Sequence, residues 1–166
     1  LIAHEGEIIC LLLDWPRRRA YLSLEEPKSQ CMVSLNVETG REEARDCAHA
    51  WHRMLLDAAG TRLLVARWGD GVTTLEAATL RPYYPAVETG AFGASISADA
   101  ALRVGFIGTR EGDGQLRDLA TGKPLMELVQ HQGPILDHQL SADGSWLLTA
   151  SQDGTAQLWD VRMRAG

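Results

Sequence analysis

The stretch from His131 to Asp160 constrains the fold of this chain more than any other. It contains three short runs of alternating or apolar residues, at 134–140, 146–151 and 155–160. Two turn signals, Asp143-Gly144 and Asp153-Gly154, separate these runs. Asp-Gly between β-rich runs is a strong hairpin signal, because glycine adopts the positive φ of tight turns at no steric cost. The stretch is therefore predicted to form an antiparallel meander of three strands.

Weaker copies of this stretch lie upstream at a regular period. In the first copy, His4-Glu5-Gly6 matches the opening His131-Gln132-Gly133 in both spacing and residue type. In each copy, the end of the third predicted strand and the turn after it form a recognisable marker. Successive markers lie 40, 42 and 42 residues apart. A period of about 40–45 residues is typical of radial repeat folds. The markers begin at Leu35, Leu75, Arg117 and Trp159.

The last copy resembles one repeat of the WD-repeat β-propeller family. The resemblance is carried by the H-x-G opening at His131, the S-x-D-G-T turn at 151–155 and the closing L-W-D that ends at Asp160. It implies an all-β fold of radially arranged, four-stranded antiparallel blades, here a partial propeller of about four blades. The expected repeat units are 4–47, 48–87, 88–129 and 130–166.

The remaining copies predict strands separated by Gly and Pro turns. We expect an outer strand at 81–87, where proline is tolerated because one side of an edge strand needs no partner. The competing hypothesis at 42–56 is a helix, which the repeat disfavours because its register needs strands there. The other expected strands lie at 8–13, 19–24, 31–37, 51–56, 62–68, 72–76, 91–97, 102–108, 116–119 and 124–129.

The resemblance assigns a structural hydrogen-bond network to His131, Ser151, Asp153 and Trp159, with Thr149 as an alternative to Ser151. A buried indole N–H or imidazole must find partners or cost a few kcal/mol. The same His, Ser and Asp could be interpreted as a nucleophilic triad. The chain lacks the G-x-S-x-G motif that places an exposed serine in many hydrolases, so we expect the structural role.

Other groups of polar residues are weaker candidates for chemistry. His49 and His52 could share a metal only on a helix, and no third ligand follows at a suitable spacing. The acidic turn at 111–114, with Asp118, resembles part of a calcium loop without its bidentate glutamate. The basic run Arg17-Arg18-Arg19 is expected to be a solvated turn, or else a contact for an acidic partner. The sequence therefore predicts neither a metal nor a cofactor.

Composition limits the partners and the compartment. The net charge is −6 and the sequence pI is about 5.3, which disfavours binding to nucleic acid or to an anionic membrane. Cys10, Cys31 and Cys47 are odd in number and fit no C-x-x-C spacing, so we expect buried or free thiols in the cytoplasm. Cys10 lies in an apolar run and is expected in the core. The sequence has no apolar run long enough to span a bilayer and no signal-peptide pattern.

The ends of the chain suggest a piece of a longer protein. The chain opens with Leu1, and too few residues follow Asp160 to complete a fourth strand of the last blade. An open arc of blades would expose two apolar faces. We consider three ways to cover them: further blades of a seven- or eight-bladed chain, a second copy paired head to tail, or four blades that close on themselves.

The resemblance to WD-repeat propellers implies a non-catalytic scaffold that binds a protein or peptide partner, within a larger and regulatory protein. Similar propellers are often joined to kinase or nucleotide-hydrolase modules. The alternative is a propeller enzyme, or a module that binds a small ligand or carbohydrate in the central channel. That alternative needs clustered His and carboxylates on the inner strands, which are mostly apolar here. The candidate partner-binding loops contain His4, Glu5, Asp70, Glu111, Asp113 and Gln132.

Overall fold

A computed structural model describes residues 7–47, 51–67, 71–88, 95–108, 113–129 and 131–162, except the side chains of Trp51, His52, Arg67 and Val129. Apart from one 3-10 turn at Trp15–Arg17, the regular structure of these residues is all β. The strands are β1 (Glu7–Asp14), β2 (Arg19–Glu26), β3 (Ser29–Asn36), β4 (Glu42–Asp46), β5 (Trp51–Leu56), β6 (Arg62–Arg67), β7 (Gly71–Glu76), β8 (Val87–Glu88), β9 (Ser95–Ala98), β10 (Val104–Gly108), β11 (Asp113–Asp118), β12 (Pro124–Val129), β13 (Ile135–Leu140), β14 (Trp146–Ser151) and β15 (Ala156–Asp160).

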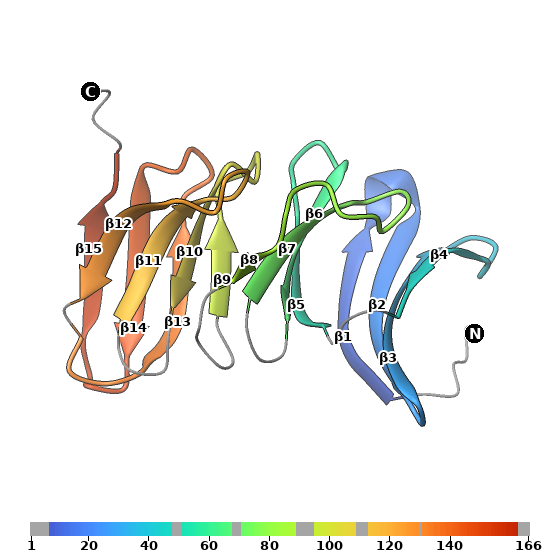
Figure 1. Ribbon diagram of the computed structural model, residues 1–166, viewed down its shortest axis with the longest axis horizontal. Helices are drawn as coiled ribbons and strands as arrows, with labels where there is room; N and C mark the ends of the chain where they lie inside the picture. Colours follow the sequence, from blue (N-terminus) through green and yellow to red (C-terminus); the bar gives the residue numbers. More distant parts are fainter. Residues whose placement is uncertain are drawn as a thin grey trace.

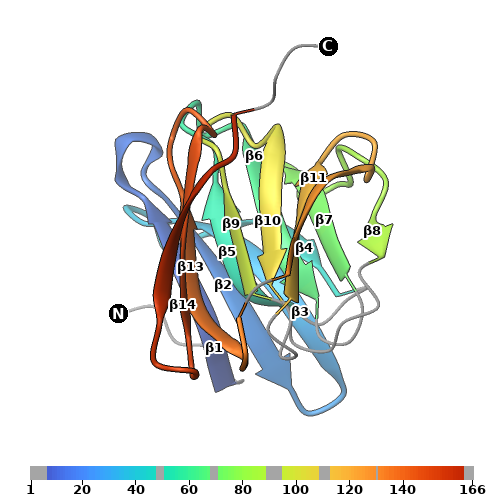
Figure 2. The ribbon, with the colours of Figure 1, turned by 90° about the vertical axis from the view of Figure 1, so that its left-hand side faces the viewer.

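The strands form four antiparallel sheets that follow one another in chain order. Three sheets have four strands, in the orders β1-β2-β3-β4, β5-β6-β7-β8 and β9-β10-β11-β12, and the last sheet is β13-β14-β15. The first strands of neighbouring sheets touch, β1 with β5, β5 with β9 and β9 with β13. Figure 1 shows the sheets as a row from the first at one end to the last at the other, and Figure 2 shows them end-on, one behind another. This arrangement is an open arc of a β-propeller.

Apolar side chains between successive sheets form three separate core clusters. Tyr21 packs with Val65 between the first and second sheets, and Leu64 packs with Ile96 between the second and third. Phe106 and other residues of the third sheet meet the fourth sheet in the last cluster. The inner sheets are covered on both faces, and their strands β7 and β10 bury residues in continuous runs and not in strict alternation.

The predicted meander at the C-terminal end is confirmed. β14 occupies 146–151 as expected, and β15 begins one residue later than predicted. Gly144 and Gly154 adopt positive φ of 74° and 84°, the conformation for which glycine was expected. The alternative helix at 42–56 is wrong, since β4 and β5 occupy that region.

The predicted outer strand at 81–87 is wrong. Only Val87–Glu88 pairs as a strand with β7, and one isolated bridge joins Leu75 to Pro82. Pro82 and Pro85 lack the N–H that a continuous ladder requires. The N–H groups of Tyr83 and Tyr84 both donate to the carbonyl of Thr74 instead, at 2.8 and 3.3 Å.

The prediction of free thiols is wrong for two of the three cysteines. Cys31 and Cys47 form a disulfide, whereas Cys10 is free and packs half-buried against the first core cluster. Met32 pairs with Asp46 across β3 and β4, so Cys31 and Cys47 lie opposite each other, one position further along. Cysteine count and spacing do not show this pairing, because it depends on the register of two strands.

Closure by four blades is also wrong, because the first and last sheets lie at opposite ends of the arc (Figure 1). Each end sheet carries exposed apolar side chains, including Leu11 and Leu13 on β1 and Leu148 and Leu158 on the last sheet. In the two internal sheets, a neighbouring sheet packs on each of the equivalent faces. Within the described residues, no helix has the length and apolar character to cross a membrane.

Candidate functional site

A chain of hydrogen bonds connects the two ends of the last repeat. Trp159 Nε1 donates to Thr149 Oγ1 at 3.0 Å, and Thr149 Oγ1 lies 2.8 Å from His131 Nε2. His131 Nδ1 lies 3.2 Å from Asp153 Oδ2. Because the ionised carboxylate only accepts, His131 carries its proton on Nδ1, and its Nε2 accepts from the Thr149 hydroxyl. All donors therefore point the same way, from the indole to the carboxylate.

Ser151 occupies a different place from the one that the sequence suggested. Its hydroxyl donates to the carbonyl of Gly133 at 2.9 Å and accepts from the Asp153 N–H at 3.2 Å. Thr149, the alternative, is the residue that contacts both Trp159 and His131. The structure therefore brings together His131, Asp153 and Trp159, and it uses Ser151 to fasten the opening loop to the turn.

Asp153 is the acceptor that holds this turn. Hydrogen bonds from the Thr155 hydroxyl, and then from the backbone N–H of Gln132, keep the pKa of Asp153 far below its ordinary value. The Gln132 N–H lies 2.8 Å from Asp153 Oδ2, while the Gln132 side chain is exposed. The last repeat thus presents Gln132 on a loop whose backbone is fixed.

A second network was missed by sequence reasoning and follows the connections between first and second strands. In each sheet a polar side chain lies at the end of the first strand. These residues are the buried Asp14, Asp57 and Asp99 and the half-buried Ser141. Asp57 accepts from the N–H of Thr61 at 2.7 Å and from the N–H and Nε of Arg62 at 3.0 and 3.2 Å. These bonds outweigh the effect of burial and lower the pKa of Asp57.

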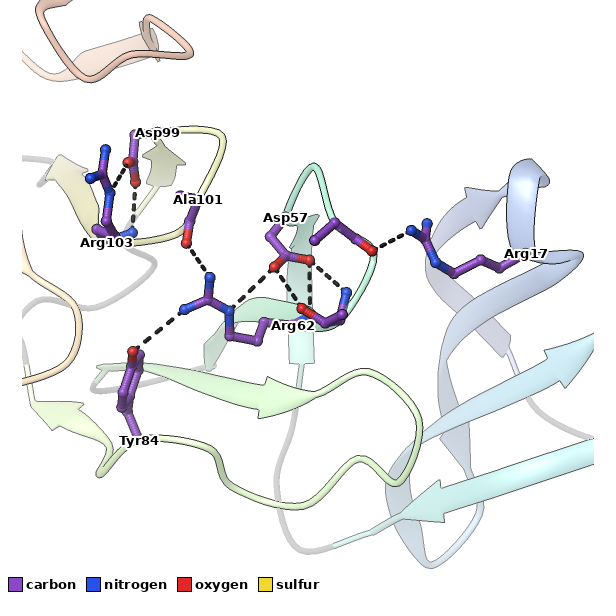
Figure 3. A network of polar contacts seen from close by, with 9 residues as sticks. Arg17, Asp57, Arg62, Tyr84, Asp99, Ala101 and Arg103 are labelled. Atoms are coloured by element: carbon purple, nitrogen blue, oxygen red, sulfur yellow. Dashed lines mark hydrogen bonds and ion pairs between the residues drawn. The ribbon is translucent and has the colours of Figure 1, made fainter.

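The third sheet repeats this arrangement. Asp99 accepts from the N–H of Arg103 at 2.6 Å and from Arg103 Nε at 3.1 Å (Figure 3). It also accepts from the N–H of Val104 at 3.0 Å. The signal in the sequence is an Asp followed four or five residues later by Arg in each of the first three repeats, whereas the fourth repeat has Ser141 at this position. This signal becomes visible once the repeats are aligned on their first hairpins.

Bonds between neighbouring loops join these carboxylate turns into a belt along one rim. Arg62 Nη2 donates to the carbonyl of Ala101 at 2.7 Å, and Arg17 reaches the carbonyl of Ala59 in the same way (Figure 3). Backbone bonds from Ala58 to Ala100 and from Ala100 to Ala142, at 2.7 and 2.9 Å, continue the series. We call this set of turns the rim belt. It fixes each loop against the loop of the next sheet.

Two of the hollows on the surface of the described residues lie between sheets. One, of about 720 Å³, lies between the outer strand β4 and the segment 78–86 of the second sheet. The other, of about 550 Å³, lies between the third and fourth sheets and is lined by Arg103, Arg162 and Asp143 among others. Both hollows have mixed polar and apolar walls.

The other candidate residues are only partly placed. Asp113 begins β11 and pairs with Val129. His4, Glu5, Asp70 and Glu111 lie outside the described residues, as do His49 and the side chain of His52. Within the described parts of the chain, no three His, Cys, Asp or Glu side chains gather as the ligands of a metal would.

Comparisons with known proteins agree with this geometry. The family model described as WD domain, G-beta repeat matches residues 122–160. The solved structures titled "Structure of U3-55K" and "Crystal structure of RRP9 WD40 repeats" each superpose with a TM-score of 0.77 over 96% of this chain, at 15% identity. The chain covers 50% and 49% of those two structures. The chain therefore has the β-propeller fold of WD40-repeat structures, and its residues 122–160 match the WD-repeat family model.

Curated relatives match a shorter part of the chain. Eukaryotic translation initiation factor 3 subunit I of Culex quinquefasciatus is 47% identical over 53 residues, and that of Bombyx mori is 45% identical over 54. These matches cover 32% of this chain and 16% of each relative. The similarity is thus confined to a segment of about the length of one repeat.

Proposed function

We propose that this chain is a non-catalytic scaffold for protein interactions and part of a larger, regulatory protein. The observation that carries the proposal is the rim belt, which holds successive loops in a fixed relation. The buried carboxylates of Asp57 and Asp99 bind the backbone of their own loops, and Arg17 and Arg62 fasten two loops to the next sheet. The belt fixes the sheets to one another, and the candidate loops of Asp113 and Gln132 lie on the opposite rim of the same sheets. Rigid sheets therefore hold these loops in a fixed arrangement, and a rigid set of loops binds a partner with little loss of conformational entropy.

The groups that could form a nucleophilic triad are used for structure. Both ring nitrogens of His131 are engaged, with Thr149 and Asp153, and the Ser151 hydroxyl donates to a backbone carbonyl. Ser151 is buried, so a substrate carbonyl has no access to its hydroxyl. These bonds support a structural role for the network and a scaffold role for the protein.

The partner in this proposal is a protein or peptide that contacts the loops of His4, Glu5, Asp70, Glu111, Asp113 and Gln132. The relatives are named as a subunit of an initiation factor, which supports membership of a multi-protein assembly. We propose repeat units at 4–47, 48–87, 88–129 and 130–166 and a location in the cytoplasm. Thiols are kept reduced in the cytoplasm, so this location requires the Cys31–Cys47 bond to open.

Affinity capture from the source lysate tests the scaffold role. The wild-type chain should retain a defined protein that mass spectrometry identifies, and a double variant, Asp113→Arg with Gln132→Arg, should bind that protein at least about tenfold more weakly. The variant Glu38→Arg changes an exposed side chain away from the candidate loops and should bind normally. Equal binding by all three chains would contradict the assignment of these loops.

The exposed faces of the end sheets must also be covered in the working protein. We propose that further blades of the same chain, or a second copy paired head to tail, pack on Leu11 and Leu13 at one end and on Leu148 and Leu158 at the other. Light scattering on the 166-residue chain distinguishes the two. A dimer that Leu11→Asp dissociates indicates the second copy, and a monomer indicates further blades.

A further inference from the structure

We propose that the Cys31–Cys47 bond is a thiol–disulfide exchange site, at which a dithiol reductant releases the outer strand β4 from the first sheet. The site combines an accessible sulfur with a weakly held strand. Cys31 is fully buried in β3, whereas Cys47 follows the last residue of β4 and is exposed. A thiolate from solvent can therefore reach the sulfur of Cys47.

Besides the disulfide, β4 is held by its ladder with β3 and by side-chain contacts at the surface. It is an edge strand that pairs only with β3, and Ala44 is its residue that packs against the first core cluster. Ion pairs join Arg45 to Glu26 at 2.8 Å and Glu43 to Arg19 at 2.7 Å, with side chains that are partly exposed to water. Such pairs contribute little in water. The ladder with β3 and the disulfide are therefore the main constraints on β4, and the disulfide is the one that a reductant removes.

The surroundings of Cys31 suit both redox states. Ser29 Oγ lies 3.5 Å from Cys31 Sγ, and Glu26 Oε2 lies 3.8 Å from it. In the disulfide the sulfur has no hydrogen to donate. After reduction, the Cys31 thiol can donate to Glu26, and the Ser29 hydroxyl can donate to the sulfur as it leaves. The buried sulfur is therefore not left without partners.

The exchange proceeds in two balanced steps. A thiolate of the dithiol attacks Cys47 Sγ and forms a mixed disulfide, while the Cys31–Cys47 bond breaks and Cys31 leaves with the electron pair and takes up a proton. The second thiolate of the reductant then attacks the mixed disulfide, and Cys47 leaves and is protonated. The protein gains two electrons and two protons, and the dithiol is oxidised to a cyclic disulfide.

Opening of the bond changes the surface of the arc. Residues 43–46 of β4 form one wall of the 720 Å³ hollow, and segment 78–86 of the second sheet forms the opposite wall. Glu26 links the two events, because its Oε1 binds Arg45 in that wall and its Oε2 faces Cys31. Reduction therefore loosens one wall of the hollow and leaves the other in place.

Alkylation tests the bond itself. The whole chain, equilibrated in air and then denatured, should take up one N-ethylmaleimide, at Cys10, and it should take up three after treatment with dithiothreitol. Three labels without reduction would overturn the proposal.

Hydrogen exchange measured by mass spectrometry tests the release of β4. Reduction should speed amide exchange across Glu42–Asp46 by about tenfold or more, since edge segments with few buried contacts open locally. β12, the outer strand of the third sheet, should be unchanged and serves as the internal reference. Unchanged exchange in β4 after complete reduction would contradict the proposal.

Two variants complete the test. Cys47→Ser should show fast exchange in β4 that dithiothreitol does not alter, and Cys10→Ser should behave as the wild type. If Cys47→Ser does not fold, the comparison of the oxidised and the reduced wild-type chain still shows whether the disulfide holds β4. The result does not depend on the scaffold role, because neither measurement requires a partner.

Discussion

Ser97 of β9 and His138 of β13 are joined by a hydrogen bond of 2.8 Å between Oγ and Nδ1, across the boundary of the third and fourth sheets. The other ring nitrogen of His138 lies 2.7 Å from Ser95 Oγ, and the ring of Phe106 packs edge-on against it, with centroids 4.7 Å apart. The imidazole is buried. These contacts make His138 a buried polar link between two blades.

Stability should therefore fall in mild acid through His138. Burial is the main cause that lowers the pKa of His138 to about 4, with Arg53 acting in the same direction and Asp137 opposing it. The unfolded chain takes up this proton near pH 6.5 and the folded chain does not, so stability is lost as the pH falls from 6.5 towards 4. The expected loss is about 3 kcal/mol.

Urea unfolding at several pH values between 4.5 and 7.5 measures this effect. His138→Gln keeps a polar side chain without a titratable ring, and its stability should vary less over this range. Identical pH dependence of the two proteins would show that His138 is not the group responsible.

Trp159 and Thr149 should stabilise the last blade as a pair. Thr149→Val removes the acceptor of the indole N–H and the partner of His131, and it should lower the free energy of unfolding by about 1–3 kcal/mol. Thr149→Ser keeps the hydroxyl and should cost less.

Trp159→Ala should cost about 3 kcal/mol of stability, since the ring also packs against the third core cluster. Arg117→Ala, at the equivalent position of the third repeat, should cost much less. Thermal and urea unfolding measure all four, and equal losses for Trp159→Ala and Arg117→Ala would show that the repeat register is wrong.

The rim belt makes Asp57 a residue of high structural importance. Asp57→Asn leaves Arg62 without its carboxylate partner and should lower stability by about 3 kcal/mol. Glu38→Gln breaks an exposed pair with Arg18 and should change stability by less than about 1 kcal/mol. Chemical denaturation of the two variants provides the comparison, and similar losses would mean that the belt does not stabilise the loops.

Two neighbouring leucines on β14 report which face of the last sheet is covered. Leu147 is fully buried against the third sheet, whereas Leu148 is 49% exposed on the opposite face. Leu147→Ala should cost about 2–5 kcal/mol, and Leu148→Ala should change stability by about 0.5 kcal/mol or less. The reverse order in urea unfolding would place the other face of the strand against the core.

The sequence predicted the elements whose determinants are local. The Asp-Gly turns at 143–144 and 153–154 specify glycines at positive φ, and the alternation along β14 specifies its extent. The period of the markers indicated the number of sheets. Local turn chemistry and side-chain periodicity were therefore sufficient for the blades themselves.

The errors concern features that depend on how strands meet. The Cys31–Cys47 bond follows from the register of β3 against β4, and the broken outer strand follows from two prolines that deprive β7 of donors. Thr149 replaced Ser151 in the network because Thr149 pairs with Gln157, two residues from Trp159, whereas Ser151 lies two residues further along β14. The rim belt joins loops about forty residues apart, so it becomes visible only when sheets are placed side by side.

The contact between Phe106 and His138 tests the central claim, that separate antiparallel sheets stack radially into a propeller arc. Nuclear Overhauser effects between the two ring systems, measured by NMR on the 166-residue chain, should be strong at a centroid separation of 4.7 Å. Cross-strand effects between Leu147 and Trp159, which are paired within the last sheet, serve as the reference. Both sets should be present. If the effects within the sheet appear without those between Phe106 and His138, the sheets form but do not stack as a propeller.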